Sequence, residues 1–365
     1  MQLVAYGAQD IYLTGNPQIT FFKVVYRRHT NFSMESIEQT FNGTVGANAR
    51  LTATVSRNGD LVHKMYLAAS PGNVALGNYG HFGLIKDVEL EIGGQRIDKQ
   101  SAQWMETWAQ LTEVNPTGNT SNQSTDMLTG TYTRFQQMAC AGGVIKTSSD
   151  PGLIHVPLQF WFCRNAGLAL PLIALQYHEV KVILTTGAAQ AGTLQLWADY
   201  IYLDTDERRR FAQVSHEYLI EQVQEESVAD SATEKTLNFN HPVKELIVSG
   251  TEDANGALTV PVTGNVGLKL NGHDRFAARN YKYFTRSQIW QHHTGFGGVV
   301  NDSIAVYSFA LKPEEHQPSG TCNFSRIDNA VLSGTFNSSA ASTIYAVNYN
   351  VLRIMSGMGG LAYSN

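Results

Sequence analysis

The chain has 365 residues, of which 43% are hydrophobic, 10% aromatic and 16% charged, and its formal net charge at pH 7 is −5. This length is enough for two domains of ordinary size. A protein that coats nucleic acid needs a basic surface to displace counterions. The acidic balance, with a longest basic run of only Arg208–Arg210, therefore argues against direct binding to a genome.

The cysteines and the distribution of apolar residues indicate the cellular environment of the protein. Cys140, Cys163 and Cys322 are odd in number and form no CxxC pair, which favours a reducing compartment over a disulfide framework. We find neither the basic and apolar regions of a signal peptide nor the run of about 18 apolar residues expected of a membrane span. Few charges and many aromatics favour a surface covered by other protein, with a large monomeric core as the alternative.

Residues 1–26 mix apolar and polar side chains and contain a turn signal at Gly15–Pro17. They precede the first strand that recurs later in the chain, so we place them outside the duplicated core described below. An apolar segment outside a domain usually packs on its own domain or on a partner. We predict that residues 1–26 are an interaction arm.

Short strands and tight turns dominate the region that follows, from Arg27 to Thr205. Asn58-Gly59 accepts the positive φ angles of a type I′ turn and predicts a hairpin, and Gly93-Gly94 ends a second alternating run. The strands are expected at residues 32–41, 51–55 and 87–92.

One helix is predicted in this region, over residues 101–111. Ser101 is a good N-cap, and Trp104, Trp108 and Leu111 share one face at helical spacing. Residues 113–152 are rich in Asn, Thr, Ser and Gly and lack periodicity. We expect them to form an exposed loop, of which 117–149 could be replaced by a short linker without loss of folding.

The stretch His155–Leu184 is predicted to be a strand, an irregular loop and a second strand. Apolar residues alternate from Val156 to Phe162 and again from Val180 to Leu184. Residues 163–176 contain Asn, Gly and Pro and suit neither a regular strand nor a long helix.

This stretch is one part of a long internal repeat. Residues 160–203 can be laid without a gap on 309–352, at an offset of 149 (309 − 160), so that Val182 meets Val331. Residues 88–94 match 266–272 at an offset of 178, and residues 37–39 match 220–222 at an offset of 183. A period this long indicates two tandem copies of one β domain rather than a many-bladed repeat.

The repeat defines the predicted domain organisation. Residues 1–26 are the arm, 27–205 the first β domain, 206–216 the connector and 217–365 the second β domain. The chain ends in RIMSGMGGLAYSN, whose glycines are expected to preclude regular structure. We predict a docking tail there.

No pattern of side chains forms a complete catalytic or metal motif. HExxH needs a second His, but Val182 and Ile220 occupy that position after His178-Glu179 and His216-Glu217. Adjacent residues on a strand point to opposite faces, so we interpret His292-His293 as a surface pair. We therefore predict no metal ligands.

Two other candidates also lack the required surroundings. Glu314-Glu315 lies in a Pro-flanked loop and is interpreted as solvated turn residues, and Gly357–Gly360 does not lead from a strand into a helix. We therefore predict no catalytic residues and no cofactor, and hence no enzyme. The seven Asn-x-Ser/Thr sequons are not expected to be used by a secretory pathway, since no secretory signal is visible; they begin at Asn31, Asn42, Asn119, Asn122, Asn301, Asn323 and Asn337.

Long motifs along the whole chain resemble the double jelly-roll major capsid proteins of nucleocytoplasmic large DNA viruses, and look most like those of the algal, chlorella-infecting phycodnaviruses. The motifs are YGAQDIYLTGNPQITFFKVVYRRHTNF (6–32), DVELEIGGQRIDK (87–99), NAGLALPLIALQYHEVK (165–181), FAQVSHEYLIEQ (211–222), SFALKPEEHQPSGTCNFSRIDNAVL (308–332) and NYNVLRIMSGMGGLAY (348–363).

The resemblance implies an all-β fold of two tandem eight-stranded jelly rolls, with short helices in the loops. It implies a late structural protein whose homotrimers form nearly hexagonal blocks that tile an icosahedral capsid and contact neighbouring blocks. The arm would touch minor capsid proteins beneath the shell, outer loops could carry glycans, and assembly would occur in the host cytoplasm. Direct contact with nucleic acid is not implied.

One departure from the family pattern leaves alternatives open. Only 17 residues, Ser249–Asn265, separate matched strands of the second domain, where longer family members carry large loops. The chain could therefore be a minor or specialised capsid variant or a jelly-roll assembly scaffold. A more distant alternative is a glycan-binding jelly-roll protein.

Overall fold

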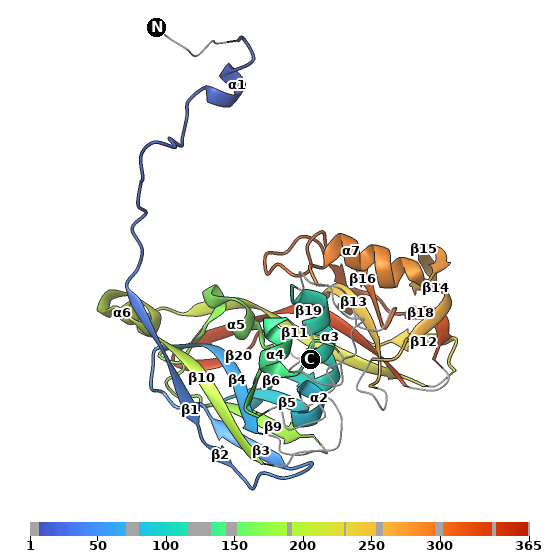
Figure 1. Cartoon of the computed structure of the whole chain (residues 1–365), viewed down its shortest axis with the longest axis horizontal. Coiled ribbons are helices and arrows are strands. Elements are labelled where there is room, and N and C mark those ends of the chain that lie inside the picture. The colour runs from blue at the N-terminus through green and yellow to red at the C-terminus, as the bar shows by residue number, and fades with distance from the viewer. Residues whose placement is uncertain are drawn as a thin grey trace.

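In a computed structural model of the chain, strands form four antiparallel sheets, and the N-terminal segment extends away from them (Figure 1). The structure describes residues 7–70, 80–114, 133–143, 152–187, 192–229, 231–252, 258–295, 302–337 and 341–363.

The first half of the chain builds two of these sheets, which we call A and B. Sheet A has the order β1-β10-β4-β7, with β8 paired to β4, and sheet B has the order β2-β3-β9-β5-β6. Their bounds are β1 Phe32–Gln39, β2 Phe41–Asn42, β3 Arg50–Thr54, β4 Leu61–Ser70, β5 Ile85–Ile92, β6 Gln95–Ser101, β7 Ile154–Pro157, β8 Leu170–Pro171, β9 Val180–Thr186 and β10 Thr193–Leu203.

The second half builds sheets C and D. Sheet C has the order β11-β19-β13-β16, with β17 on β13 and β20 on β19, and sheet D has the order β12-β18-β14-β15. Their bounds are β11 His216–Val228, β12 Glu234–Leu237, β13 Pro242–Gly250, β14 Val262–Leu270, β15 His273–Asn280, β16 Ile304–Ser308, β17 Cys322–Asn323, β18 Ala330–Phe336, β19 Ser342–Met355 and β20 Met358–Leu361.

The two halves share one topology. Leaving out the short β2, β8, β17 and β20, each half has a sheet of its first, eighth, third and sixth strands and a sheet of its second, seventh, fourth and fifth strands. This is the strand order of a jelly roll. The prediction of two tandem jelly rolls is confirmed.

Each jelly roll has its own core between its two sheets. In the first, Leu194, Leu196 and Ala198 of β10 face inward with Met65 and Leu67 of β4, and all are nearly fully buried. Alternation with period two places these residues on one face of their strands. Burying each large aliphatic side chain contributes about 1.5–3 kcal/mol.

Helices lie mainly in the connections. The predicted helix after β6 is confirmed: Ser101 caps α3 by accepting a hydrogen bond from the backbone N–H of Trp104. The helical bounds are α1 Ile11–Thr14, α2 His81–Leu84, α3 Ala102–Thr112, α4 Arg134–Ala139, α5 Trp161–Arg164, η1 Ala166–Leu168, α6 Thr205–Gln213, a π-helical turn η2 Tyr283–Ser287, α7 Gln288–His292 and η3 Phe324–Arg326.

The hairpin predicted at Asn58-Gly59 is wrong. β3 and β4 flank this turn but belong to sheets B and A, so the chain crosses from one sheet to the other. Gly59 is needed for a different reason, because a Cβ atom there would lie 2.8 Å from Cβ of Tyr200. The predicted turn at Gly93-Gly94 is confirmed, with φ angles of 58° and 84° between β5 and β6.

The strand predicted from Val156 to Phe162 is too long. β7 ends at Pro157, and Trp161–Arg164 forms the helical turn α5. Alternation is misleading here because Leu158, Phe160, Trp161 and Phe162 are all buried whichever way they point. The second strand of that stretch is confirmed as β9.

The repeat is real, but its register at β9 is wrong by one residue. Leu90 and Leu268 are equivalent at the offset of 178, and they pair with Val182 and Leu332 respectively. The offset for this strand is therefore 150, not 149. The predicted partner Val331 lies on the opposite face of its strand, because a slip of one residue reverses every side chain.

Two segments expected to be irregular contain structure. Most of residues 113–152 lies outside the described residues, but Arg134–Ala139 forms α4 with a Thr133–Gln136 capping box. At the C-terminus, Ser356 and Gly357 turn the chain so that β20 pairs with β19. The glycines there permit a tight hairpin instead of preventing one.

Candidate functional site

The face of sheet C that points away from its own core is covered by the first jelly roll. The rings of Trp104 in α3 and Tyr345 in β19 lie 5.2 Å apart. The Gln103 side chain donates a hydrogen bond to the carbonyl oxygen of Gly250 at 2.8 Å. The Thr107 hydroxyl donates to the Ser249 hydroxyl at 3.0 Å. Tyr345 is 1% exposed, so this seam between the jelly rolls is packed like a core.

A second contact joins the neighbouring edge strands β6 and β11. The side chain of Gln222 donates to the carbonyl oxygen of Ile97, and the Ser101 hydroxyl donates to Glu225 at 2.9 Å. Asp98 accepts from Gln100 at 2.9 Å and from the backbone of Val223 at 3.3 Å. Burial nevertheless raises the pKa of Asp98 to about 7.

Charged side chains from both jelly rolls meet at Glu221 in β11. Arg164 of α5 lies 3.0 Å from one of its oxygens and Lys244 of β13 lies 2.7 Å from the other. Burial alone would raise the pKa of Glu221, but Arg164, His316 and Lys244 outweigh burial and lower it to about 2. Close cations keep this buried carboxylate ionised because their attraction exceeds the cost of removing its charge from water.

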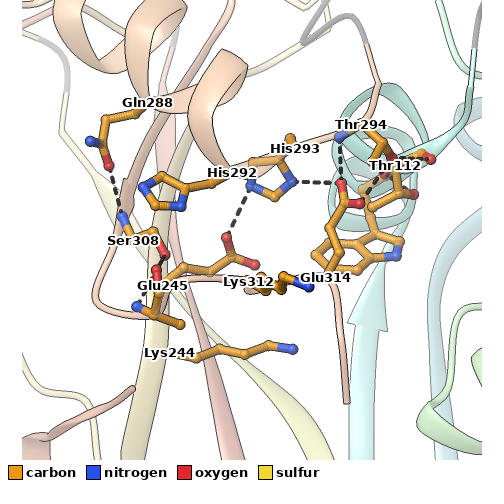
Figure 2. Close-up of polar contacts among 12 residues, drawn as sticks. Thr112, Lys244, Glu245, Gln288, His292, His293, Thr294, Ser308, Lys312 and Glu314 are labelled. Atoms are coloured by element: carbon orange, nitrogen blue, oxygen red, sulfur yellow. Dashed lines mark hydrogen bonds and ion pairs between the residues drawn. The ribbon is translucent and has the colours of Figure 1, made fainter. Parts of the chain in front are cut away.

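His293, at the end of α7, lies between two carboxylates (Figure 2). Its Nε2 is 3.0 Å from Glu245 and its Nδ1 is 3.0 Å from Glu314. Burial disfavours the charged imidazole, but Glu245 and Glu314 raise the pKa of His293 to about 9. The ring is therefore an imidazolium that donates to both acids at neutral pH.

The same cluster reaches across to the first jelly roll. Glu314 accepts from the backbone and hydroxyl of Thr294 at 2.9 Å each, and the Thr294 hydroxyl lies 3.2 Å from the carbonyl oxygen of Thr112 at the end of α3 (Figure 2). The predictions of a surface His292-His293 pair and a solvated Glu314 are therefore wrong. Only Glu315 of that acidic pair is largely exposed.

Another buried carboxylate, Glu106, holds the segment after α4 in place. Glu106 accepts hydrogen bonds from the backbone N–H groups of Gly142 and Gly143, from Gln110, and lies 3.1 Å from His81. Burial opposes ionisation, yet these donors keep the pKa of Glu106 below its ordinary value.

The other candidates from the sequence also have structural partners. His178 hydrogen-bonds Gly359 of β20 through Nδ1, and His216 contacts the carbonyl oxygen of Phe211. Among the described residues, no three His, Cys, Asp or Glu side chains are grouped to hold a metal ion. The cysteines, all within the described part, form no disulfide bond.

Two surface features remain, and the first adjoins the seam at Trp108, Arg164 and Glu314. A groove of about 700 Å³ lies between α4 and the outer face of sheet A, with Tyr66, Phe135, Met138 and Pro157 in its lining. In the arm, large apolar side chains are 69–99% exposed: Ile11, Tyr12, Leu13, Ile19, Phe21, Phe22, Val24, Val25 and Tyr26. Within the described residues, no helix is both long and apolar enough to cross a membrane.

Comparison with known proteins gives one consistent result. A family model described as the N-terminus of major capsid proteins matches residues 20–187, and one described as the large eukaryotic DNA virus major capsid protein matches residues 207–360. The chain is 52% identical to the major capsid protein of Pyramimonas orientalis virus and 43% identical to that of Paramecium bursaria Chlorella virus 1, each over 100% of this chain and 99% of the relative.

Solved structures agree with the sequence relatives. A crystal structure of PBCV-1 VP54 superposes with a TM-score of 0.78 and 39% identity over 95% of this chain and 100% of that chain. The Faustovirus major capsid protein, at 13% identity and a TM-score of 0.66, covers 96% of this chain and 94% of its own and shares the fold.

Two fused jelly rolls joined by a core-like seam define the class of double jelly-roll viral shell proteins. The chain belongs to the major capsid protein family of large eukaryotic DNA viruses, with phycodnavirus major capsid proteins among its relatives. As a member, it is a structural protein of the virion capsid. The resemblance seen in the sequence is confirmed.

Sequence reasoning missed the seam itself. We singled out His293, Glu314 and the Trp104–Trp108 face from the sequence, but interpreted them as a surface residue, a solvated loop residue and one face of a helix. His293 and Glu245 are 48 positions apart in the sequence, and no local spacing marks such a pair. The signal available in the sequence was Lys244-Glu245 within the apolar run Val243–Val248, whereas His293 and Glu314 stand among polar residues.

Proposed function

We propose that three copies of this chain associate into a homotrimer whose six jelly rolls form a nearly hexagonal tile of an icosahedral shell. The observation that carries this proposal is the repeated topology of the two halves. Two equivalent domains in each chain let threefold symmetry approximate sixfold packing, which a single domain in each chain would not do. The fixed seam supports it, because a tile must keep its domains in one arrangement.

The direct test is a mass measurement of the purified protein. A trimer has three times the 40.1 kDa mass of the chain, and native mass spectrometry distinguishes it from a monomer or dimer. A monomer at micromolar concentration would contradict the proposal, because an obligate interface buries about 2,000–5,000 Å² or more and does not dissociate at such dilution.

The arm is proposed to bind minor capsid proteins beneath the shell. Its exposed aromatic and aliphatic side chains support this role, since large apolar patches on a folded protein mark interaction sites. Deleting residues 1–26 should leave a soluble trimer that no longer builds shells, as judged by electron microscopy of assembly products. Normal shells from the truncated chain would contradict this role.

The remaining parts of the proposal concern chemistry and place. We infer a structural role without catalysis, a cofactor or direct contact with nucleic acid, and assembly in the host cytoplasm. The first jelly roll is placed at 27–205, the connector at 206–216 and the second jelly roll at 217–365. Of the sequons, Asn31, Asn42 and Asn323 are exposed and available for surface glycans. Copy number in purified particles tests the major subunit against a specialised variant.

A further inference from the structure

The contact between the two jelly rolls of one chain supplies a template for contacts between chains. Within the chain, β6 and the helix α3 that follows it pack on β11 and on the outer face of sheet C. β6 is the fifth strand of its jelly roll, and β11 is the first strand of the other. The packing leaves Tyr345 and Val347 of sheet C at 1% and 0% exposure.

In the part of the chain that the structure describes, no second jelly roll covers the equivalent elements at the other two ends, although α4 packs beside β7 on sheet A. β15 is the fifth strand of the second jelly roll and is followed by the helical segment 281–292, and β1 is the first strand of the first jelly roll. Figure 1 shows β1 and β15 at opposite ends of the molecule. Every residue of β15 except Phe276 is exposed, and so are the first five residues of β1.

The two uncovered surfaces carry opposite charge. On the second jelly roll, Arg275 and Arg279 of β15 and Lys282 and Arg286 of the helical segment are all exposed. Arg286 is already paired with Asp302, whereas the charged ends of Arg279 and Lys282 lie over the rings of Tyr283 and Tyr281 on exposed side chains. This surface is basic in a chain with a net charge of −5.

The surface at the other end has an apolar centre flanked by the carboxylates of Glu38 and Asp199, with the exposed Lys64 of β4 in the same groove lining as Asp199. In β10, Leu196 and Ala198 point into the core, and Trp197 and Asp199 point outward. Trp197 is opposite Glu38 of β1, and Asp199 is opposite Ser36. Tyr66 of β4 continues the same outward row beside Trp197. This face of sheet A corresponds to the face of sheet C that α3 covers, yet Glu38 is exposed and Trp197 and Tyr66 are only partly buried.

We propose that β15 and segment 281–292 of one copy pack on β1 and the outer face of sheet A of the next copy, repeating between chains the packing of β6 and α3 on sheet C within the chain. This inference rests on the proposed trimer and assigns its surfaces. The contact is heterologous, and a heterologous contact whose rotation closes produces a ring. The ring then alternates two kinds of seam: within each chain the charges are enclosed and already paired, and between chains the charges are exposed until assembly pairs them.

The two seams differ in chemistry in a way that suits their order of formation. The seam within the chain forms on folding, so its apolar side chains and its paired charges are enclosed together and are never presented to solvent by a folded subunit. The seam between chains must stay soluble before assembly, and charged surfaces achieve this while steering the two ends together. Exposed charge pairs are screened by salt, so the trimer should associate more slowly at high ionic strength.

Charge reversal at the two surfaces tests the assignment. One variant carries Arg279→Glu and Lys282→Glu, and a second carries Glu38→Lys and Asp199→Lys. Each places like charges across the contact and should raise the dissociation constant of the trimer at least about tenfold, measured by mass photometry over a dilution series. A chain with all four changes restores opposite charges and should recover most of the trimer.

The controls separate this interface from folding and from the trimer itself. Arg209→Glu with Arg210→Glu changes the same charge on the exposed face of α6 and should leave the trimer intact, and circular dichroism melts should show that all variants fold. If the unmodified chain is monomeric, the trimer proposal fails. If the unmodified chain is trimeric but both reversed pairs associate normally, or the fourfold variant does not recover, this interface is wrong.

Discussion

At the scale of single residues, the seam within the chain is a set of enclosed charges that balance. Glu221, Glu245 and Glu314 face Arg164, Lys244 and His293. The balance holds only while His293 is protonated. Enclosed charges stabilise a fold weakly when paired, but removing one partner is costly because the other is left buried and uncompensated.

Replacing His293 by alanine tests this directly. Glu245, fully buried, would lose the imidazolium that lies 3.0 Å from it, and we expect a loss of about 3–5 kcal/mol in the free energy of unfolding. The adjacent His292→Ala is the matched control, since His292 is half-exposed and hydrogen-bonds the carbonyl oxygen of Leu311 rather than a buried carboxylate; it should cost about 0.5 kcal/mol or less. Equal losses in denaturant titrations would contradict the special role of His293.

The pH dependence of stability follows from the same two groups. The pKa of His293 rises from 6.5 to about 9 on folding, so its contribution is complete below about pH 6.5 and is lost as the pH rises through about 9. The pKa of Glu221 falls from 4.5 to about 2, so its contribution is present above about pH 4.5 and is lost as the pH falls toward 2. Thermal melts from pH 6 to 10 should show a decline that His293→Gln reduces; an unchanged slope would argue against this titration.

At the scale of elements, two similar turn signals had different outcomes. Gly93-Gly94 joins two neighbouring strands of sheet B, whereas Asn58-Gly59 links strands of different sheets. The residues of a turn indicate that the chain reverses direction, but they do not indicate which sheet the next strand joins. Likewise, the loop predicted to be replaceable at 117–149 includes Gly142 and Gly143, whose N–H groups satisfy the buried Glu106, so its removal should destabilise the fold.

The β5–β6 hairpin offers a matched pair of substitutions. Gly93 and Gly94 both have positive φ angles, but only a Cβ at Gly93 would collide with the His178 ring, while the space beside Gly94 is open. Gly94→Ala should cost about 1–2 kcal/mol from backbone strain alone. Gly93→Ala should cost more, because displacing His178 also breaks its hydrogen bond to Gly359. Equal unfolding free energies for the two variants would show that the hairpin does not need this close approach.

At the scale of the whole molecule, the sequence predicted the duplication and the fold but not the joint between the copies. Repeated motifs and alternating strands follow from local side-chain pattern, and these were visible. The one-residue register error at β9 and the missed seam share a cause. Where both faces of a strand are covered by protein, apolar residues occur on both, and the sequence does not show which face points into the domain's own core. Both faces of sheet C are buried, so Tyr345 and Val347 are as apolar as residues of the core behind them.

The shared seam predicts that the second jelly roll does not fold alone. Ile220, Ile247, Tyr345 and Val347 belong to the hydrophobic cluster centred on the first jelly roll, and a fragment of residues 217–365 would expose them to water. Losing about 1.5–3 kcal/mol for each such side chain approaches the total stability of about 5–15 kcal/mol typical of a domain. The fragment should therefore be aggregated or unfolded by circular dichroism, and the whole chain should unfold in one cooperative calorimetric transition. A soluble, cooperatively folding fragment, or two separate transitions in the whole chain, would show that the jelly rolls are independent and that the seam is only a contact between them.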